Sequence, residues 1–144
     1  MALRVELKPG ERIIIGDCIV TNADQRTRLL IEGETPVLRQ KDILTKNRAD
    51  TPSKRIYLAV QMMYTSKDPR LHHQVYFGLI QELLEAVPSV WPHIENINNH
   101  ILTGEMYKAL KHAKKLIAYE QELFDNAKRN ADLRSNRKAD RQPA

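Results

Sequence analysis

The sequence predicts an α+β protein: a small N-terminal antiparallel β-sheet or barrel, a C-terminal helical bundle of about four helices, and a disordered basic tail. Three observations support this division. Residues 1–50 hold short β-branched runs between turn sequences. From Thr51 onward, apolar residues recur at helical spacing. After Leu133 almost no apolar residue remains to offset the entropy of ordering. The predicted units are residues 1–50, 51–127 and 128–144.

About five short strands are expected in the first unit. Glycine-containing turn sequences, KPGE, IGD and EGETP, separate the β-branched runs. The runs expected to form strands are RVEL, RIII, CIVT, TRLLIE and PVLRQ. A sheet this small is marginal by itself, so it needs a second layer or a partner subunit.

The second unit begins with a strong helix-start signal. Thr51-Pro52 combines an N-cap residue with a proline at the first helical position, and Asp68-Pro69 repeats the pattern. The segment SKRIYLAVQMMYT is apolar on nearly every side, which is typical of a helix buried on several faces. The sequence therefore predicts a first helix after Pro52 and a second after Pro69.

The apolar stripes of the later helices can be read from their spacing. In the second helix the stripe consists of Val75, Leu79, Leu83 and Val87, with Tyr76, Ile80 and Leu84 beside them. In the third helix it consists of Val90, Ile94, Ile97 and Ile101. In the fourth helix, expected over residues 105–129, it consists of Met106, Leu110, Ala113, Ile117 and Phe124. Lysines occupy most of the opposite face of this last helix, so it is predicted to lie on the surface of the bundle.

The positive charge is concentrated at the C-terminus. The chain carries a formal net charge of +5, and residues 128–144 hold six Lys or Arg against two Asp. This segment is expected to be either a solvated tail or a non-specific RNA-contacting arm. The N-terminal residues lack the apolar run of a signal peptide, and no segment is long and apolar enough to span a membrane. A soluble, cytoplasmic protein without membrane contact is expected.

No pattern of catalytic residues is present. The sequence contains no Gly-x-Ser-x-Gly, no phosphate loop and no dinucleotide fingerprint, so an enzyme is not expected. The single cysteine, Cys18, cannot form an internal disulfide and is expected to be a small buried side chain in a strand. The histidines lack ligand spacing and are expected at surfaces or caps, so neither a metal nor a cofactor is predicted: His72, His73, His93, His100 and His112.

Cationic side chains in the first unit are the candidates for contact with a nucleic acid. All aromatic residues fall after Thr51, so base stacking on the predicted sheet is not expected. RNA binding would depend on lysine, arginine and backbone groups. The candidate RNA-binding residues are Lys8, Arg12, Arg26, Arg28, Arg39 and Lys41. The alternative is that these are ordinary solvated residues on exposed strand faces.

Four separated stretches carry a family resemblance. LKPGERIIIGDCIV, VLRQKDI, TPSKRIYLAVQMMY and YKALKHAKKLIAYE resemble, in this order from Leu3 to about Phe124, the FlbT family of bacterial flagellar-biosynthesis regulators. The resemblance implies a post-transcriptional regulator that acts at the 5′ untranslated leader of flagellin messenger RNA. Such a regulator usually lowers translation or message lifetime, together with a small partner protein called FlaF.

The first fifty residues are also similar to the carbon storage regulator family, whose strand-swapped dimers bind GGA-type sequences in message leaders. This likeness implies a homodimer or higher oligomer. In that family two arginines precede the Gly-Glu turn, where this chain has Leu7 and Lys8, and Arg39 matches an arginine that contacts RNA. Lysine lacks the planar fork that pairs with a guanine edge. General RNA contact at Lys8, Arg39 and Lys41 is therefore expected in place of a GGA preference.

Two functions follow from the sequence. The first is a non-enzymatic regulator whose sheet contacts a flagellin leader while its helices dock a partner or a second copy. The second is an adaptor or chaperone-like protein that binds FlaF or flagellin and affects translation indirectly. Met62, Met63 and Tyr64 are the adaptable side chains that could contact such a partner, and packing in the core is the alternative for all three.

Overall fold

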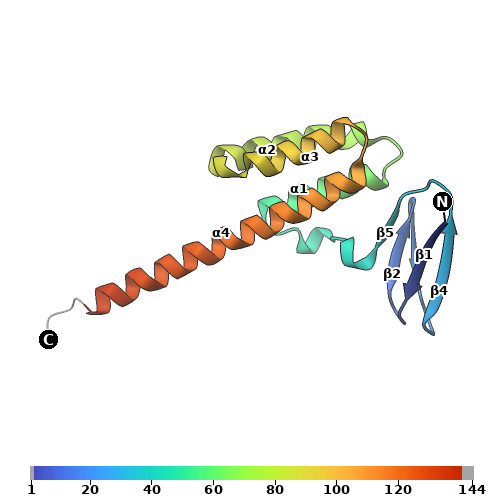
Figure 1. Cartoon of the computed structure of the whole chain (residues 1–144), viewed down its shortest axis with the longest axis horizontal. Helices are drawn as coiled ribbons and strands as arrows, with labels where there is room; N and C mark the ends of the chain where they lie inside the picture. The colour runs from blue at the N-terminus through green and yellow to red at the C-terminus, as the bar shows by residue number, and fades with distance from the viewer. Residues whose placement is uncertain (1, 141–144) are drawn as a thin grey trace.

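The computed structural model describes residues 2–140. A β unit lies at one end of the molecule, and a long C-terminal helix extends past the bundle toward the other end (Figure 1). The strands of the β unit are β1 (Ala2–Leu7), β2 (Arg12–Ile15), β3 (Cys18–Thr21), β4 (Thr27–Glu32) and β5 (Val37–Arg39). Two 3₁₀ turns follow, η1 (Gln40–Asp42) and η2 (Lys46–Arg48). Each strand begins and ends within two residues of its predicted position.

The helical unit contains α1 (Pro52–Thr65), α2 (His73–Ala86), α3 (Trp91–Leu102) and α4 (Met106–Asp140). Short 3₁₀ turns precede α2 and α3, namely η3 (Pro69–His72) and η4 (Pro88–Val90). The predicted α+β class, with an N-terminal antiparallel β unit followed by helices, is confirmed. None of the helices within the described residues is both long enough and apolar enough to cross a membrane.

The β unit is a small sandwich of two antiparallel sheets. One sheet pairs β1 with β4, and the other has the order β3-β2-β5. Val5, Leu7 and Ile13 are buried between the sheets. The opposite face of β2 and β5 meets the helices, because Leu38 belongs to the helical core and Ile14 packs against it. The helices thus supply the second layer that so small a sheet requires.

The turn between β2 and β3 requires glycine. Gly16 and Asp17 form a two-residue connection, and Gly16 has a φ of +63°, as the first central residue of a type II′ turn does. A Cβ atom at this position would come within 2.8 Å of Thr35 Cγ2. The expectation that Cys18 is buried is wrong, because β3 is the outer strand of its sheet and all four of its residues are exposed.

The predicted apolar stripes are correct where a helix has neighbours on that side. Val90, Ile94, Ile97 and Ile101 are all buried, as expected. In α2 the buried residues are Tyr76, Ile80 and Leu83, whereas Val75 is exposed. The predicted stripe of α2 was too wide, because among the helices α2 makes its main contacts with α1 and can bury only one narrow face.

The end of α4 differs from the sequence prediction. A helix ending near Arg129 and a disordered basic tail were expected, whereas α4 continues to Asp140. Every side chain from Phe124 to Ser135 is exposed. Alanine, leucine, lysine and arginine are strong helix formers, so backbone hydrogen bonds can extend the helix without burial. Residues 141–144 of the predicted tail lie outside the described residues.

Three side chains of α1 hold the segment that follows β5. Tyr57, Gln61 and Tyr64 recur at helical spacing and form what we call the α1 clamp. The Gln61 amide accepts from Leu44 N at 2.8 Å and donates to Leu44 O at 3.1 Å. The Tyr64 hydroxyl accepts from Val37 N at 3.3 Å and donates to Val37 O at 3.0 Å. The clamp therefore fixes both ends of residues 37–44 against the helical unit.

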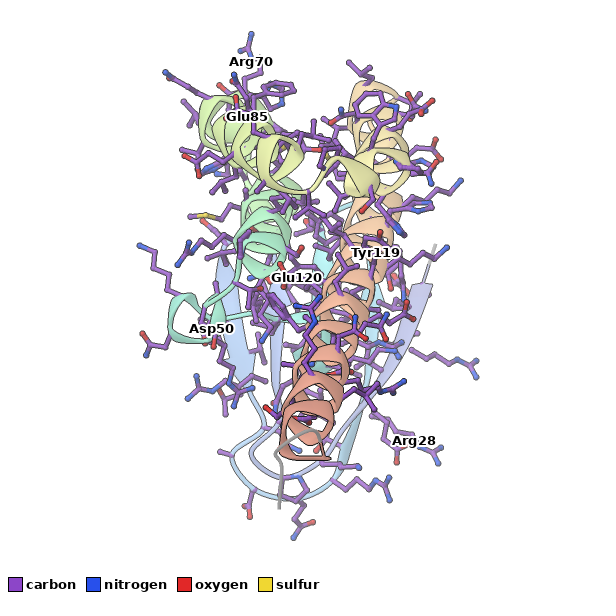
Figure 2. The ribbon with its side chains drawn as sticks, turned by 90° about the vertical axis from the view of Figure 1, so that its left-hand side faces the viewer. Arg28, Asp50, Arg70, Glu85, Tyr119 and Glu120 are labelled. Carbon is purple, nitrogen blue, oxygen red and sulfur yellow. The ribbon has the colours of Figure 1, made fainter. Side chains whose placement is uncertain are left out.

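A buried carboxylate adds a link between α4 and this segment. Asp42 is only 3% exposed and forms an ion pair with Lys114 of α4, while its carbonyl oxygen accepts from the Tyr57 hydroxyl. Burial, followed by the negative charge of Asp42, raises the pKa of Tyr57, so the phenol remains a protonated donor. Figure 2 shows Glu120 on the side of α4 that faces α1, where it accepts from Ser53 N at 2.9 Å.

Two histidines stack where α3 meets α4. The rings of His100 and His112 have centroids 4.8 Å apart and an interplanar angle of 17°. Desolvation lowers the pKa of His112 below its usual value, and the positive charge of Lys115 and the nearby His100 and His93 lower it further. The folded protein therefore binds a proton at His112 less readily than the unfolded chain does.

This shift predicts a loss of stability in mild acid. Below about pH 6.5 the unfolded chain takes up the proton first, so the free energy of unfolding falls as pH decreases. A His112→Gln variant is expected to lose less stability than the wild type between about pH 7.5 and about pH 5.5. Urea unfolding at both pH values measures this difference, with His72→Gln, which lies outside the stack, as the control. If wild type and His112→Gln lose the same free energy of unfolding over this pH range, His112 is not the source of the acid sensitivity.

Candidate nucleic-acid interface

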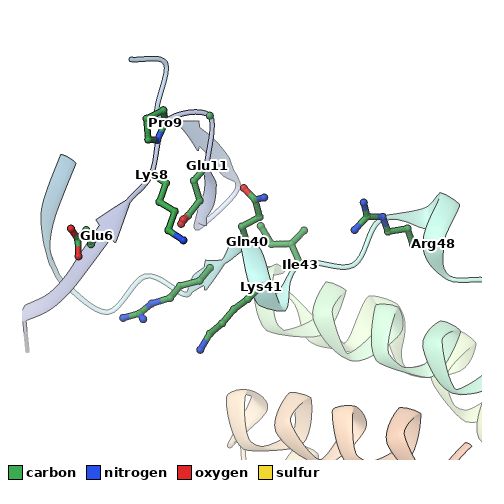
Figure 3. A pocket seen from close by; sticks show the side chains of 10 residues that line it. Glu6, Lys8, Pro9, Glu11, Gln40, Lys41, Ile43 and Arg48 are labelled. Carbon is green, nitrogen blue, oxygen red and sulfur yellow. The ribbon is translucent and has the colours of Figure 1, made fainter. Parts of the chain in front are cut away.

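A concave surface encloses a volume of about 730 Å³ where the turn after β1 meets the segment after β5. In Figure 3, Lys8 approaches this space from the turn and Lys41 approaches it from η1. We call this surface the basic groove. Its lining residues are Glu6, Lys8, Pro9, Gly10, Glu11, Arg39, Gln40, Lys41, Ile43 and Arg48.

Hydrogen bonds fix the turn that carries Lys8. Glu11 N donates to Lys8 O at 3.0 Å, which closes the turn after β1. The Asn22 amide donates to the carbonyl oxygens of Leu7, Lys8 and Gln25 at 3.0, 3.1 and 2.8 Å. The two N–H groups of this amide are thus shared among three backbone acceptors, and they hold this wall of the groove in place.

The opposite wall is fixed from β2 and from the α1 clamp. Arg12 N donates to Gln40 Oε1 at 2.6 Å, directly before Lys41. Asp42, directly after Lys41, is held by Tyr57 and Lys114. Lys41 is therefore an exposed cation on a backbone that is anchored on both sides. Such a backbone reduces the entropy lost when the side chain binds a ligand.

The groove carries more positive than negative charge. Four cations line it, Lys8, Arg39, Lys41 and Arg48, against the carboxylates of Glu6 and Glu11. Glu6 is already paired with Arg26, at 2.8 Å. Within the described part of the chain, no ion pair shorter than 4.0 Å involves any of the four cations. Such a cluster of unneutralised cations can bind consecutive phosphate groups.

The structure brings together three of the six predicted RNA-binding residues. Lys8, Arg39 and Lys41 all line the basic groove, although 31 and 33 positions separate the last two from Lys8 in the sequence. Arg12, Arg26 and Arg28 do not line it. Arg12 contributes its backbone N–H to Gln40, Arg26 pairs with Glu6, and Arg28 lines another concavity with Arg4.

Arg48 is a groove residue that sequence reasoning missed. It belongs to η2, and Figure 3 shows its side chain pointing from the linker back toward Ile43 at the edge of the groove. The one available signal was the short polar stretch TKNRAD, in which Lys46 and Arg48 lie close to each other. This stretch shows that positive charge is present, but it does not show which surface of the folded protein the side chains face.

The three predicted partner-contacting residues do not share a surface. Met63 is 1% exposed and fills the helical core, Met62 is 39% exposed, and Tyr64 is half-buried with its hydroxyl bonded to Val37. Consecutive residues of a helix point about 100° apart, so three in a row cannot face one partner. Of these three residues, only Met62 has an exposed side chain.

Most of the chain matches a known protein family. The family described as "Flagellar protein FlbT" matches residues 3–124, a range that includes every residue of the basic groove. Most of the exposed part of α4 lies beyond this match. No solved structure matches the chain.

Several named relatives extend over most of the chain. "Probable flagellum biosynthesis repressor protein FlbT 1" of Bradyrhizobium diazoefficiens is 60% identical over 124 residues, which cover 85% of each chain. A Rhodopseudomonas palustris protein named "Probable flagellum biosynthesis repressor protein FlbT" is 56% identical, covering 86% of this chain and 98% of its own. "Flagellum biosynthesis repressor protein FlbT" of Caulobacter vibrioides is 34% identical, covering 85% of this chain and 89% of its own. By both the family match and these relatives, the chain belongs to the FlbT family.

Proposed function

We propose that this protein represses flagellar biosynthesis by binding the 5′ untranslated leader of flagellin messenger RNA, in the cytoplasm and without enzymatic chemistry. The names of its relatives support a repressor of flagellum biosynthesis. The observation that supports RNA as the ligand is the convergence of Lys8, Arg39, Lys41 and Arg48 on one groove. This cluster lies entirely within the family match.

The groove residues suggest how the leader would be held. The four cations would contact phosphates and position a single strand, but they carry no sequence information. The Gln40 amide accepts from Arg12 N through its oxygen and keeps its NH₂ group for a base edge. A leader bound in this way would be blocked from the ribosome, which lowers translation and changes message lifetime.

A gel-shift titration tests direct recognition. Purified full-length protein is mixed with flagellin leader RNA or with a scrambled RNA of equal length and composition. We expect tighter binding to the leader, with an affinity that falls steeply as salt rises because counterions are released. Absence of leader binding, or equal binding to both RNAs even with a FlaF-type partner added, would refute direct recognition.

An adaptor function is the second candidate, and one specific observation favours it. Leu71, Val75 and Phe77 are exposed large apolar side chains around the start of α2. Exposed apolar groups of this kind often contact another protein. In this alternative the helical unit would bind a FlaF-type protein, flagellin or a second copy of the chain. Copurification of such a protein in stoichiometric amount, without leader RNA, would favour the adaptor over the RNA-binding regulator.

A further inference from the structure

A further concavity, of about 420 Å³, lies between the β-sandwich and the first turn of α4. We call it the tyrosine pocket, because Tyr64 of α1 and Tyr107 of α4 both line it. Its other lining residues include Leu3, Ile31, Val37, Arg39, Lys41 and Asp42. The pocket therefore combines an aromatic and apolar lining with two exposed cations.

The tyrosine pocket and the basic groove share a wall. Arg39 and Lys41 line both concavities, so the two spaces lie on either side of the segment from β5 to η1. The α1 clamp fixes this segment through Tyr57, Gln61 and Tyr64. A single strand whose phosphates contact Arg39 and Lys41 could therefore place a base in the neighbouring pocket.

Tyr107 has the exposure and surroundings of a stacking residue. It is 42% exposed, and its ring centroid lies 5.9 Å from that of Tyr64, with the planes inclined by 46°. Lys111 Nζ lies 5.2 Å from the Tyr107 centroid. An exposed cation–π contact is weaker than base–aromatic stacking, so a base can replace the ammonium, which is then free to contact a phosphate.

The hydroxyl of Tyr64 is bonded to both backbone groups of Val37, so the second aromatic wall is already fixed before a ligand enters. We propose that the tyrosine pocket binds one unpaired base of the RNA strand, stacked on Tyr107, while Arg39 and Lys41 hold the adjoining phosphates. This inference rests on the proposed RNA-binding function. It assigns base contact to a helix residue, although the strands themselves carry no aromatic side chain.

The test uses the full-length protein and leader RNAs that carry 2-aminopurine, a fluorescent adenine analogue, at one unpaired position at a time. The variants are Tyr107→Leu, Tyr107→Trp and, as a matched control on the same helix, Phe124→Leu. Phe124 is 51% exposed and lines neither concavity. Circular dichroism checks that each variant keeps its helix content.

We expect strong quenching of 2-aminopurine fluorescence at one leader position when wild-type protein binds. Tyr107→Leu should bind the leader about tenfold more weakly, because one base loses its stacking partner. It should also lose the quenching while keeping the salt dependence of the wild type, since the phosphate contacts remain. Tyr107→Trp should retain both affinity and quenching, and Phe124→Leu should behave as the wild type does.

Two results would overturn the base pocket while leaving the proposed function intact. One is leader binding by the wild type without quenching at any unpaired position. The other concerns Tyr107→Leu. This variant would contradict the base pocket if it kept wild-type affinity and quenching, or if its salt dependence decreased together with its affinity. A wild-type protein that binds no leader at all would instead refute the proposed function, and the base pocket with it.

Discussion

Replacing Lys8, Arg39 and Lys41 together with alanine is expected to weaken leader binding roughly 100-fold, because each lost contact is worth about 1 kcal/mol. The slope of log K against log salt should also become shallower by about 2, since about 0.7 of a counterion is released per phosphate contact on a single strand. All three side chains are exposed, so the variant should fold as the wild type does. Filter binding at several salt concentrations measures both quantities.

A matched control distinguishes binding in the basic groove from binding through the net positive charge of the protein. Arg55, Lys67 and Lys115 are exposed cations of the helical unit, and replacing all three with alanine removes the same charge. We expect this control to lose little affinity, because its cations lie outside the groove. If the control loses as much affinity as the groove variant, the RNA is bound by net charge and not by the basic groove.

Gln61→Leu is expected to lower the free energy of unfolding by roughly 2 to 3 kcal/mol. The substitution removes the partner of both Leu44 N and Leu44 O, and an unsatisfied, partly buried backbone group costs about 1 kcal/mol or more. The segment that carries Gln40 and Lys41 should loosen as well. Leader affinity should therefore fall, although Gln61 lines neither concavity.

Urea unfolding and native-state hydrogen exchange of residues 37–44 check this prediction. Gln81→Leu makes the same chemical change at an exposed position of α2 and should alter stability by less than about 0.5 kcal/mol. Exchange protection of residues 37–44 that is unchanged in Gln61→Leu would show that the α1 clamp does not fix this segment. The coupling between helices and groove would then have no physical basis.

Local signals predicted the elements of this fold well. The turn at Gly16, the β-branched run before it and the N-cap at Thr51 each depend on a few adjacent residues. Thr51 indeed accepts a hydrogen bond from Lys54 N. Such signals need no knowledge of the rest of the chain. The strand positions and the start of α1 therefore followed from the sequence.

Features that depend on neighbours in space could not be predicted in this way. The buried face of α2 depends on its contact with α1, and the exposure of Cys18 depends on β3 being an outer strand. The sequence did not predict that α4 continues to Asp140, because the prediction relied on burial of apolar residues. A helix can also extend through the intrinsic helix propensity of its residues. The local pattern was compatible with either a buried or an exposed side chain in α2 and β3, and with either helix or disorder at the end of α4.

Only part of the candidate site could be predicted, because the site also depends on neighbours in space. Lys8, Arg39 and Lys41 could be selected as cations near strand ends, but nothing in the sequence placed them in one groove. Arg48 of η2 and Tyr107 of α4 join them only because the folded chain brings both elements to concavities that Arg39 and Lys41 also line. A surface built from the turn after β1, the β5–η1 segment, η2 and α4 is determined by tertiary packing, which residue spacing does not report.

Crosslinking of flagellin leader RNA to the intact protein, with the attached peptides identified by mass spectrometry, tests the central claim most directly. That claim is that the leader lies in the basic groove, on a β unit anchored to the helices. The predicted crosslinks fall on peptides that contain Lys8, Arg39 and Lys41, and Arg48. Crosslinks confined to α2 and α3, or to α4 beyond Phe124, would contradict it.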